Sequence, residues 1–145
     1  MSAKEIRASE NRFWDEWNKS KPTAMAALDE TFAADLIFHG GSGREFHGLK
    51  DFKQYQSGFY DAFPDNHATI EDLLVDGDKA IVRYSITGTH KGQFTGIPPT
   101  NKKLAMWIIE IDRFAGGKIV EGWSRYDTLG IMQQLEVIPS PGAGK

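Results

Sequence analysis

The sequence predicts a single α+β domain, in which N-terminal helices cover one face of a curved, cone-like antiparallel sheet. Apolar residues recur mainly at helical spacing up to residue 63, and from residue 67 onward they recur with a period of two. Pro64 separates the two regions and is expected to end the preceding helix. We place the domain at residues 1–138 and a flexible tail, rich in Pro and Gly, at residues 139–145.

The first half of the chain is expected to form three helices and one short strand. In residues 3–19 one face recurs at three- and four-residue steps, which is typical of an amphipathic helix, and consists of Ile6, Glu10, Phe13, Trp14 and Trp17. A shorter helix follows at 24–32, after Pro22, which a first helical turn tolerates. Residues 36–39 predict a strand, and residues 48–63 predict the third helix.

The second half of the chain is expected to form two hairpins and a closing helix. Strands at 67–75 and 79–91 flank the turn signal Asp76-Gly77, and strands at 103–114 and 118–127 flank the loop at 115–117. A helix at 128–135 follows, with Asp127 as its N-cap and with Leu129, Met132 and Leu135 facing inward. Helices on one face of such a sheet leave a cavity, and small-molecule sites favour such places.

The composition argues against several functional classes. The chain has no cysteine, which excludes disulfides and thiolate metal ligands and is typical of a reducing cytoplasm. Its net charge is −3 without a basic stripe, which argues against nucleic-acid binding. It shows no apolar run of membrane-spanning length, no signal-peptide pattern, no phosphate loop and no His cluster at metal spacing. We therefore expect a cytoplasmic protein that binds neither nucleic acid, membranes nor a metal.

Several stretches, in this order, resemble the SnoaL-like polyketide cyclase family. They are Phe38-His39-Gly40, residues 48–53, residues 62–65, the run from Gly88-Thr89-His90 to Pro98-Pro99-Thr100, residues 112–114, residues 117–121, Asp127 and residues 133–135. The resemblance covers about residues 30–135. It implies the cone-shaped fold of the nuclear transport factor 2-like superfamily, a homodimer, and neither a metal nor an organic cofactor. In some members it also implies aldol ring closure of a polyketide ester.

The chain departs from this family where the chemistry is expected. The resemblance implies a His and, two residues later, an acid/base Asp on the final strand, and these positions hold Gly122 and Ser124. The polar partner on the preceding strand is Glu110. Its neighbours Ile108 and Ile111 are apolar, and apolar surroundings raise the pKa of a carboxyl, so we expect Glu110 to be the acid/base group. The alternative is a strand carboxylate paired with a cation such as Arg83.

Strand register decides what faces Glu110. A three-residue loop at 115–117 sets Glu110 opposite Gly122, which would leave room above the carboxyl for a ligand, whereas a two-residue loop sets Glu110 opposite Trp123. We prefer the first register. Further catalytic candidates are His39, as a second proton-transfer group or a structural residue, and Tyr126, as a donor to a substrate oxygen or a core residue. His90 is expected to be structural. Expected substrate-binding residues are Trp14, Trp17, Tyr55, Phe59, Met106, Ile108, Gly122 and Ser124.

The other face of the sheet predicts a partner. Four apolar residues line it, namely Trp107, Ile109, Ile111 and Trp123, and we expect a homodimer packed sheet on sheet. The leading functional hypothesis is cofactor-independent acid/base chemistry on a small apolar carbonyl compound, as in a cyclase, isomerase or dehydratase. The alternatives are a ligand-binding protein without chemistry, and a hydrolase in which Glu110 activates water with Tyr126 or Ser124.

Overall fold

The computed structural model describes residues 1–139 and confirms the α+β class. Within these residues, four helices accompany a six-stranded curved sheet with the order β2-β1-β6-β5-β4-β3. Neighbouring strands run antiparallel, with one exception: β1 and β6 are parallel, so the sheet is mixed rather than purely antiparallel as expected. The predicted tail lies, apart from Pro139, outside the described residues.

The helices are α1 (Ala3–Trp17), α2 (Lys21–Thr31), α3 (Leu49–Ala62) and α4 (Thr128–Gln134). Ser2 begins α1 with a capping box, because its hydroxyl accepts from the Glu5 N–H and the Glu5 carboxylate accepts from the Ser2 N–H. The second helix starts three residues earlier than predicted, since Ser20 caps it and Pro22 occupies its first turn. Asp127 caps α4 as expected, by accepting from the Gly130 N–H at 2.8 Å.

The strands are β1 (Phe32–His39), β2 (Glu45–His47), β3 (His67–Asp76), β4 (Lys79–Thr89), β5 (Lys103–Ala115) and β6 (Lys118–Tyr126). The first strand is longer than predicted and begins directly where α2 ends. The three-residue strand β2, which pairs with β1, was not predicted because it is too short to show a period.

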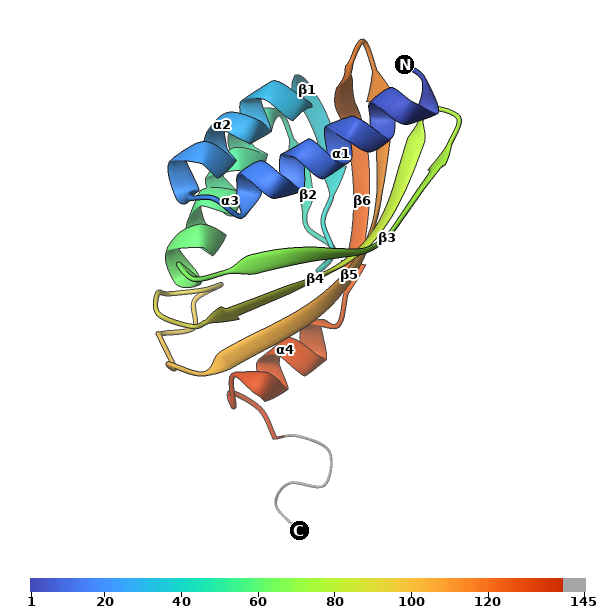
Figure 1. Cartoon of the computed structure of the whole chain (residues 1–145). Coiled ribbons are helices and arrows are strands. Elements are labelled where there is room, and N and C mark those ends of the chain that lie inside the picture. Colours follow the sequence, from blue (N-terminus) through green and yellow to red (C-terminus); the bar gives the residue numbers. More distant parts are fainter. Residues whose placement is uncertain (140–145) are drawn as a thin grey trace.

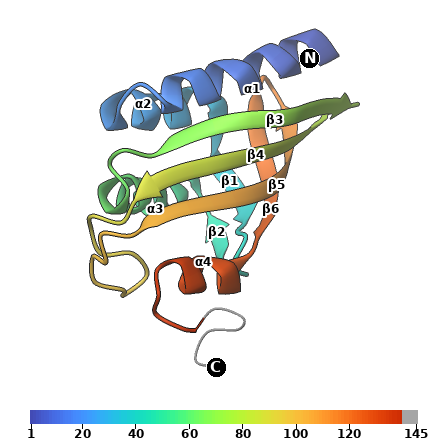
Figure 2. The same ribbon diagram turned by 60° about the horizontal axis from the view of Figure 1, so that its bottom comes forward.

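The sheet bends around the first three helices, which lie together on its concave side (Figure 1). In this layer α1 packs against β3 and β4, while α2 and α3 pack against β1. The last helix, α4, packs against β5 at the other end of the molecule (Figure 2). There the Gln134 side-chain amide bonds both backbone groups of Ala105, at 2.7 and 2.8 Å, beyond the point where β6 has ended. The arrangement leaves the concave face of β4, β5 and β6 pointing toward the helices.

The closing hairpin has a register that neither loop length predicts. The turn has two residues, because Ala115 pairs with Lys118, and a β-bulge follows between Arg113 and Phe114. The bulge leaves Val120 unpaired and shifts the strands by one more residue, so that Glu110 faces Ser124 rather than Gly122. The predicted partner was therefore wrong by two residues. A two-residue error preserves the face, so Glu110 and Ser124 both point inward and are both buried.

The core is rich in aromatic rings from the helices and from β1, and the buried face of α1 agrees with the prediction. The closing helix differs in one respect. Ile131 and Leu135 are buried, whereas Leu129 is 60% exposed, which corrects its predicted inward position. No helix within residues 1–139 is long and apolar enough to cross a membrane.

Candidate functional site

A cavity of about 90 Å³ lies between the helices and the concave face of the sheet. Its walls are mostly aromatic and aliphatic, which suits an apolar ligand. Most of the predicted site residues line it, namely Trp14, Trp17, Tyr55, Phe59, Met106, Ile108, Glu110, Ser124 and Tyr126. Its lining also includes residues that sequence reasoning did not propose, among them Phe38, Ser42, Arg44, Phe46 and Tyr84.

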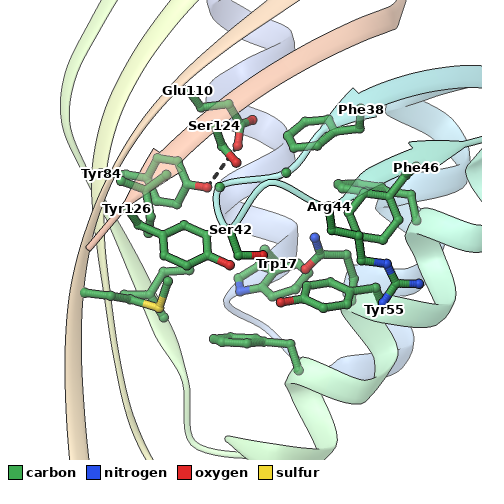
Figure 3. Close-up of a pocket in the computed structure, with 18 of the residues that line it drawn as sticks. Trp17, Phe38, Ser42, Arg44, Phe46, Tyr55, Tyr84, Glu110, Ser124 and Tyr126 are labelled. Atoms are coloured by element: carbon green, nitrogen blue, oxygen red, sulfur yellow. Dashed lines mark hydrogen bonds between the residues drawn. The ribbon is translucent and has the colours of Figure 1, made fainter. Parts of the chain in front are cut away.

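Among the described residues, Glu110 is the one carboxyl group that lines this cavity (Figure 3). It lies on the inward face of β5, and Tyr84 on β4 lies diagonal to it and donates its hydroxyl at 3.0 Å. The Tyr84 ring is itself held against Trp14, with ring centroids 4.3 Å apart. The alternative pairing of Glu110 with Arg83 is wrong, because Arg83 points to the outer face and bonds Asp72 at 2.6 Å.

Burial raises the pKa of Glu110 to about 7. Hydrogen bonds from Asp112 and from the Tyr84 hydroxyl lower this pKa, and the nearby charge of Glu10 raises it. A carboxyl with a pKa near neutrality is populated in both protonation states at neutral pH. It can therefore accept and return a proton, which is what general acid/base catalysis requires.

Two further carboxyls lie behind Glu110, and sequence reasoning did not propose either of them. Glu10 on α1 is 1% exposed, Asp112 on β5 is 0% exposed, and Glu110 itself is 6% exposed. Asp112 lies close enough to both glutamates to share a proton with either of them. Burial, followed by the charges of Glu10 and Glu110, raises the pKa of Asp112 well above its usual range. Burial likewise raises the pKa of Glu10.

A signal for these two residues was present in the sequence. Glu10 is a carboxyl on the inward face of an amphipathic helix, where a charge is normally avoided. Asp112 stands two residues after Glu110 on a strand, and this spacing places both carboxyls on one face. Their contact brings together α1 and β5, which no local pattern predicts.

Hydroxyl groups, the Gln56 amide and one cation also belong to the polar part of the lining. Ser124 lies opposite Glu110, and Tyr126 lies opposite Ile108. At the other side of the cavity Arg44 lies over the rings of Phe46 and Tyr55, 4.6 and 5.4 Å from their centroids (Figure 3). Burial, together with the neighbouring Tyr126, raises the pKa of Tyr55, so this hydroxyl stays protonated. These groups can donate hydrogen bonds to ligand oxygens.

The structure places His39 on the opposite face of the sheet, outside the cavity. Its two ring nitrogens bond Glu45 at 2.6 Å and Glu121 at 2.8 Å, and its ring stacks on Trp123. Those carboxylates raise the pKa of His39. The prediction of a second proton-transfer group in the pocket fails for His39, because Phe38 and His39 alternate on β1 and it is Phe38 that points inward.

Gly122 is also absent from the cavity lining, and the room predicted above Glu110 does not exist there. A side-chain carbon at position 122 would lie 2.4 Å from the Phe38 ring and 3.0 Å from Asp112 Oδ1. Phe38 therefore fills the space beside this glycine.

His90 is structural, as expected: it is fully buried and its Nδ1 lies 2.9 Å from the Thr100 hydroxyl.

Comparison with known proteins identifies the family. The family model described as SnoaL-like polyketide cyclase matches residues 9–135. The chain belongs to the SnoaL-like polyketide cyclase family. No curated protein matches its sequence.

Solved structures of similar proteins share the SnoaL-like fold. A candidate polyketide cyclase from Bacillus cereus is 32% identical, with a TM-score of 0.74 over 95% of this chain and 87% of that one. A candidate SnoaL-like polyketide cyclase from Jannaschia is 20% identical, with a TM-score of 0.85 over 96% and 98% of the two chains. AclR, described as a candidate hydroxylase from Streptomyces galilaeus, is 24% identical, with a TM-score of 0.82 over 95% and 100%.

This SnoaL-like chain therefore arranges its acidic groups differently from the pattern that the resemblance implies. The final strand β6 supplies Gly122 and Ser124, and no carboxyl, to the inward face. The carboxyls come from β5 and from α1 instead. Within the described residues, no group of three or more His, Asp or Glu side chains is arranged to hold a metal ion.

Proposed function

We propose that this protein catalyses cofactor-independent acid/base chemistry on a small apolar carbonyl compound, with Glu110 as the group that takes and returns the proton. The observation that carries the proposal is a buried carboxyl, with a pKa of about 7, at the end of an aromatic-lined cavity. Membership of a polyketide cyclase family supports a carbonyl substrate and favours ring closure over the related isomerase and dehydratase reactions.

In the proposed reaction the Glu110 carboxylate removes a proton from the carbon next to the ligand carbonyl. An O–H bond forms on Glu110, and the electron pair of the broken C–H bond moves into an enolate. The enolate oxygen accepts hydrogen bonds from donors in the lining, for which Tyr126 and Ser124 are the candidates. The apolar walls, including Trp14, Trp17 and Phe59, hold the body of the ligand and exclude water. In ring closure the enolate carbon then attacks a second carbonyl carbon of the ligand, so that a C–C bond forms while the C=O π bond breaks. The alkoxide formed in this step takes the proton back from Glu110.

Hydrogen–deuterium exchange tests the proton transfer without knowledge of the natural substrate. The protein is incubated in D2O with propiophenone or ethyl benzoylacetate, and loss of the C–H signal next to the carbonyl is followed by NMR. Glu110→Gln keeps the shape of the side chain and removes the base, so we expect the catalysed exchange to fall by about 10²–10⁴-fold. Glu71→Gln, an exposed carboxyl bonded to Ser85 on the outer face, is the matched control and should exchange at the wild-type rate.

Equal exchange by Glu110→Gln and wild type would refute the role of Glu110. One observation favours a second candidate, a ligand-binding protein without chemistry: Gly122 and Ser124 stand where the resemblance implies His and Asp. In that case the same compounds quench the fluorescence of Trp14 and Trp17, which line the cavity, and no exchange occurs. Ester cleavage of ethyl benzoylacetate that depends on Glu110 would instead indicate the hydrolase.

The apolar outer face of the sheet supports a homodimer as the working form. Trp107 is 62% exposed and Ile109 is 56% exposed, and both belong to β5. Large exposed apolar side chains side by side are typical of an interface. Sedimentation velocity at micromolar concentration should give a dimer, and Trp107→Lys should give a monomer. A monomeric wild-type protein would contradict this assembly. A cytoplasmic location stays a prediction from the composition.

A further inference from the structure

Three buried carboxyls form a continuous group that leads from the cavity to helix α1. Glu110 faces the cavity, Asp112 lies behind it on the same strand, and Glu10 lies beyond Asp112 on α1. The strand neighbours of Asp112 are Ala80 on β4 and Gly122 on β6. Both neighbours are small, and this leaves room for the Asp112 carboxyl beneath α1.

Among the described residues, two donors lie next to the group besides its own protons: the Tyr84 hydroxyl, which bonds Glu110, and the Trp14 indole N–H, which lowers the pKa of Glu10. Both oxygens of Asp112 and one oxygen of Glu10 are buried without any N–H or O–H partner among the described residues. In residues 1–139 no Lys, Arg or His side chain shifts the pKa of any of the three carboxyls. Carboxylates this close cannot all be ionised in a dry interior, because like charges repel strongly at low dielectric. For the two Asp112 oxygens, a carboxyl O–H is the remaining donor among the described residues.

We propose that Asp112 and Glu10 are positioning residues that share protons with Glu110, so that the three carboxyls act as one proton-exchanging unit behind the cavity. This inference rests on the proposed function, in which Glu110 exchanges a proton with the ligand. When Glu110 takes that proton, the unit gains one proton and loses one negative charge, and it reverses both changes when the proton returns.

Asp112 stands at the branch point of this unit. It holds one proton and has a glutamate on either side, so its O–H can point to Glu110 or to Glu10. Pointed at Glu110, it stabilises the ionised carboxylate and lowers the pKa of that group. The charge of Glu10 acts in the opposite direction and raises the pKa of Glu110. The two neighbours thus tune the same carboxyl with opposite signs.

The surroundings of Glu110 contain few other titratable groups. From β4 the Tyr84 hydroxyl donates to Glu110 and lowers its pKa, and the pKa of Tyr84 is itself raised well above its usual range by burial, so it stays a donor. From β6 the facing side chain is Ser124, and from β1 the cavity receives Phe38. From α1 the groups are Glu10 and the buried indole N–H of Trp14, which lies near Glu10 and lowers the pKa of that carboxyl.

The test measures the protonation of Glu110 directly, in the full-length protein and without any ligand. Glutamate side-chain carboxyls are labelled with 13C, the Glu110 signal is assigned by its loss in Glu110→Gln, and its midpoint is followed by NMR against pH. We expect Glu10→Gln to lower the midpoint by about one pH unit, because a negative neighbour is removed. We expect Asp112→Leu to raise it by about the same amount, because a donor is removed.

Two further variants separate proton sharing from a structural effect. Asp112→Asn keeps an N–H donor and the shape of the side chain, so the Glu110 midpoint should stay within a few tenths of a pH unit of wild type and lie below that of Asp112→Leu. Glu71→Gln, on the outer face, should leave the midpoint unchanged. Circular dichroism shows which variants are folded. Midpoints that are the same in wild type, Glu10→Gln and Asp112→Leu, or that move in the same direction in Glu10→Gln and Asp112→Leu, would overturn the proposal. Opposite shifts without carbonyl exchange would leave the unit standing and refute the proposed function.

Discussion

Replacing Gly122 by Ala is expected to destabilise the fold, because Phe38 fills the space beside this glycine. The added carbon would lie 2.4 and 2.5 Å from two Phe38 ring carbons, and carbon atoms in contact normally stay about 3.5–4.0 Å apart. The ring would have to withdraw by about 1 Å. It has little freedom to do so, because Phe52 packs against Phe38 with ring centroids 4.5 Å apart, and Asp112 Oδ1 lies 3.0 Å from the new carbon on another side.

Overpacking of this kind costs about 1–3 kcal/mol. For a domain of this length we therefore expect the melting temperature of Gly122→Ala to fall by about 3–9 °C. Gly58→Ala is the matched control, since Gly58 lies within α3 and no atom of residues 1–139 other than the local helix backbone lies within 4 Å of a carbon added there. There the same substitution should stabilise the protein, by up to about 1 kcal/mol, because Ala favours a helix over Gly.

A double-mutant cycle attributes the cost to Phe38. We expect Gly122→Ala to be less harmful by at least about 1 kcal/mol in a Phe38→Leu background, as measured by urea unfolding, because the smaller side chain removes the collision. Equal costs in both backgrounds would refute the reasoning, as would a Gly122→Ala protein that melts within about 1 °C of wild type. The resemblance implies a His at position 122, and such a side chain would need the space that Phe38 occupies here.

Two further predictions concern protonation. The pKa of Glu110 is about 7 in the folded protein against an ordinary value of 4.5, so its contribution favours folding below pH 4.5 and is lost as the pH rises through 7. The stability of Glu110→Gln relative to wild type should therefore rise by about 3 kcal/mol between pH 4.5 and pH 8 in urea unfolding, and a flat difference would contradict it. His39 lies outside the cavity, so His39→Gln should leave carbonyl exchange unchanged, while NMR titration should place the His39 midpoint of wild type above 6.5 and lower it in Glu121→Gln. Loss of exchange in His39→Gln would show that the outer face takes part in the chemistry.

Local patterns in the sequence determined most of the elements of this fold. The change of apolar period around Pro64 separated the helical layer from the long strands, and Asp76-Gly77 and the glycines near 116 marked the two hairpins. Alternation along β5 put Glu110 on the inward face, and a carboxyl among apolar neighbours already indicated a raised pKa. The element types, the turns and the inward face of Glu110 depend on residues that are near one another in the chain, so local sequence patterns predict them.

Contacts between distant segments were decided by the tertiary structure alone. A bulge at Val120 set the register of the last hairpin, and a single extra residue leaves no distinct mark in the sequence. The long pairing of β1 with β6 put Phe38 against Gly122 and turned His39 to the outer face. The packing of α1 against β3 and β4 brought Glu10 close to Asp112 and Glu110 on β5. Burial and mutual repulsion of these carboxyls exist only once the helix has docked, because both depend on the water and the charges that surround each group in space.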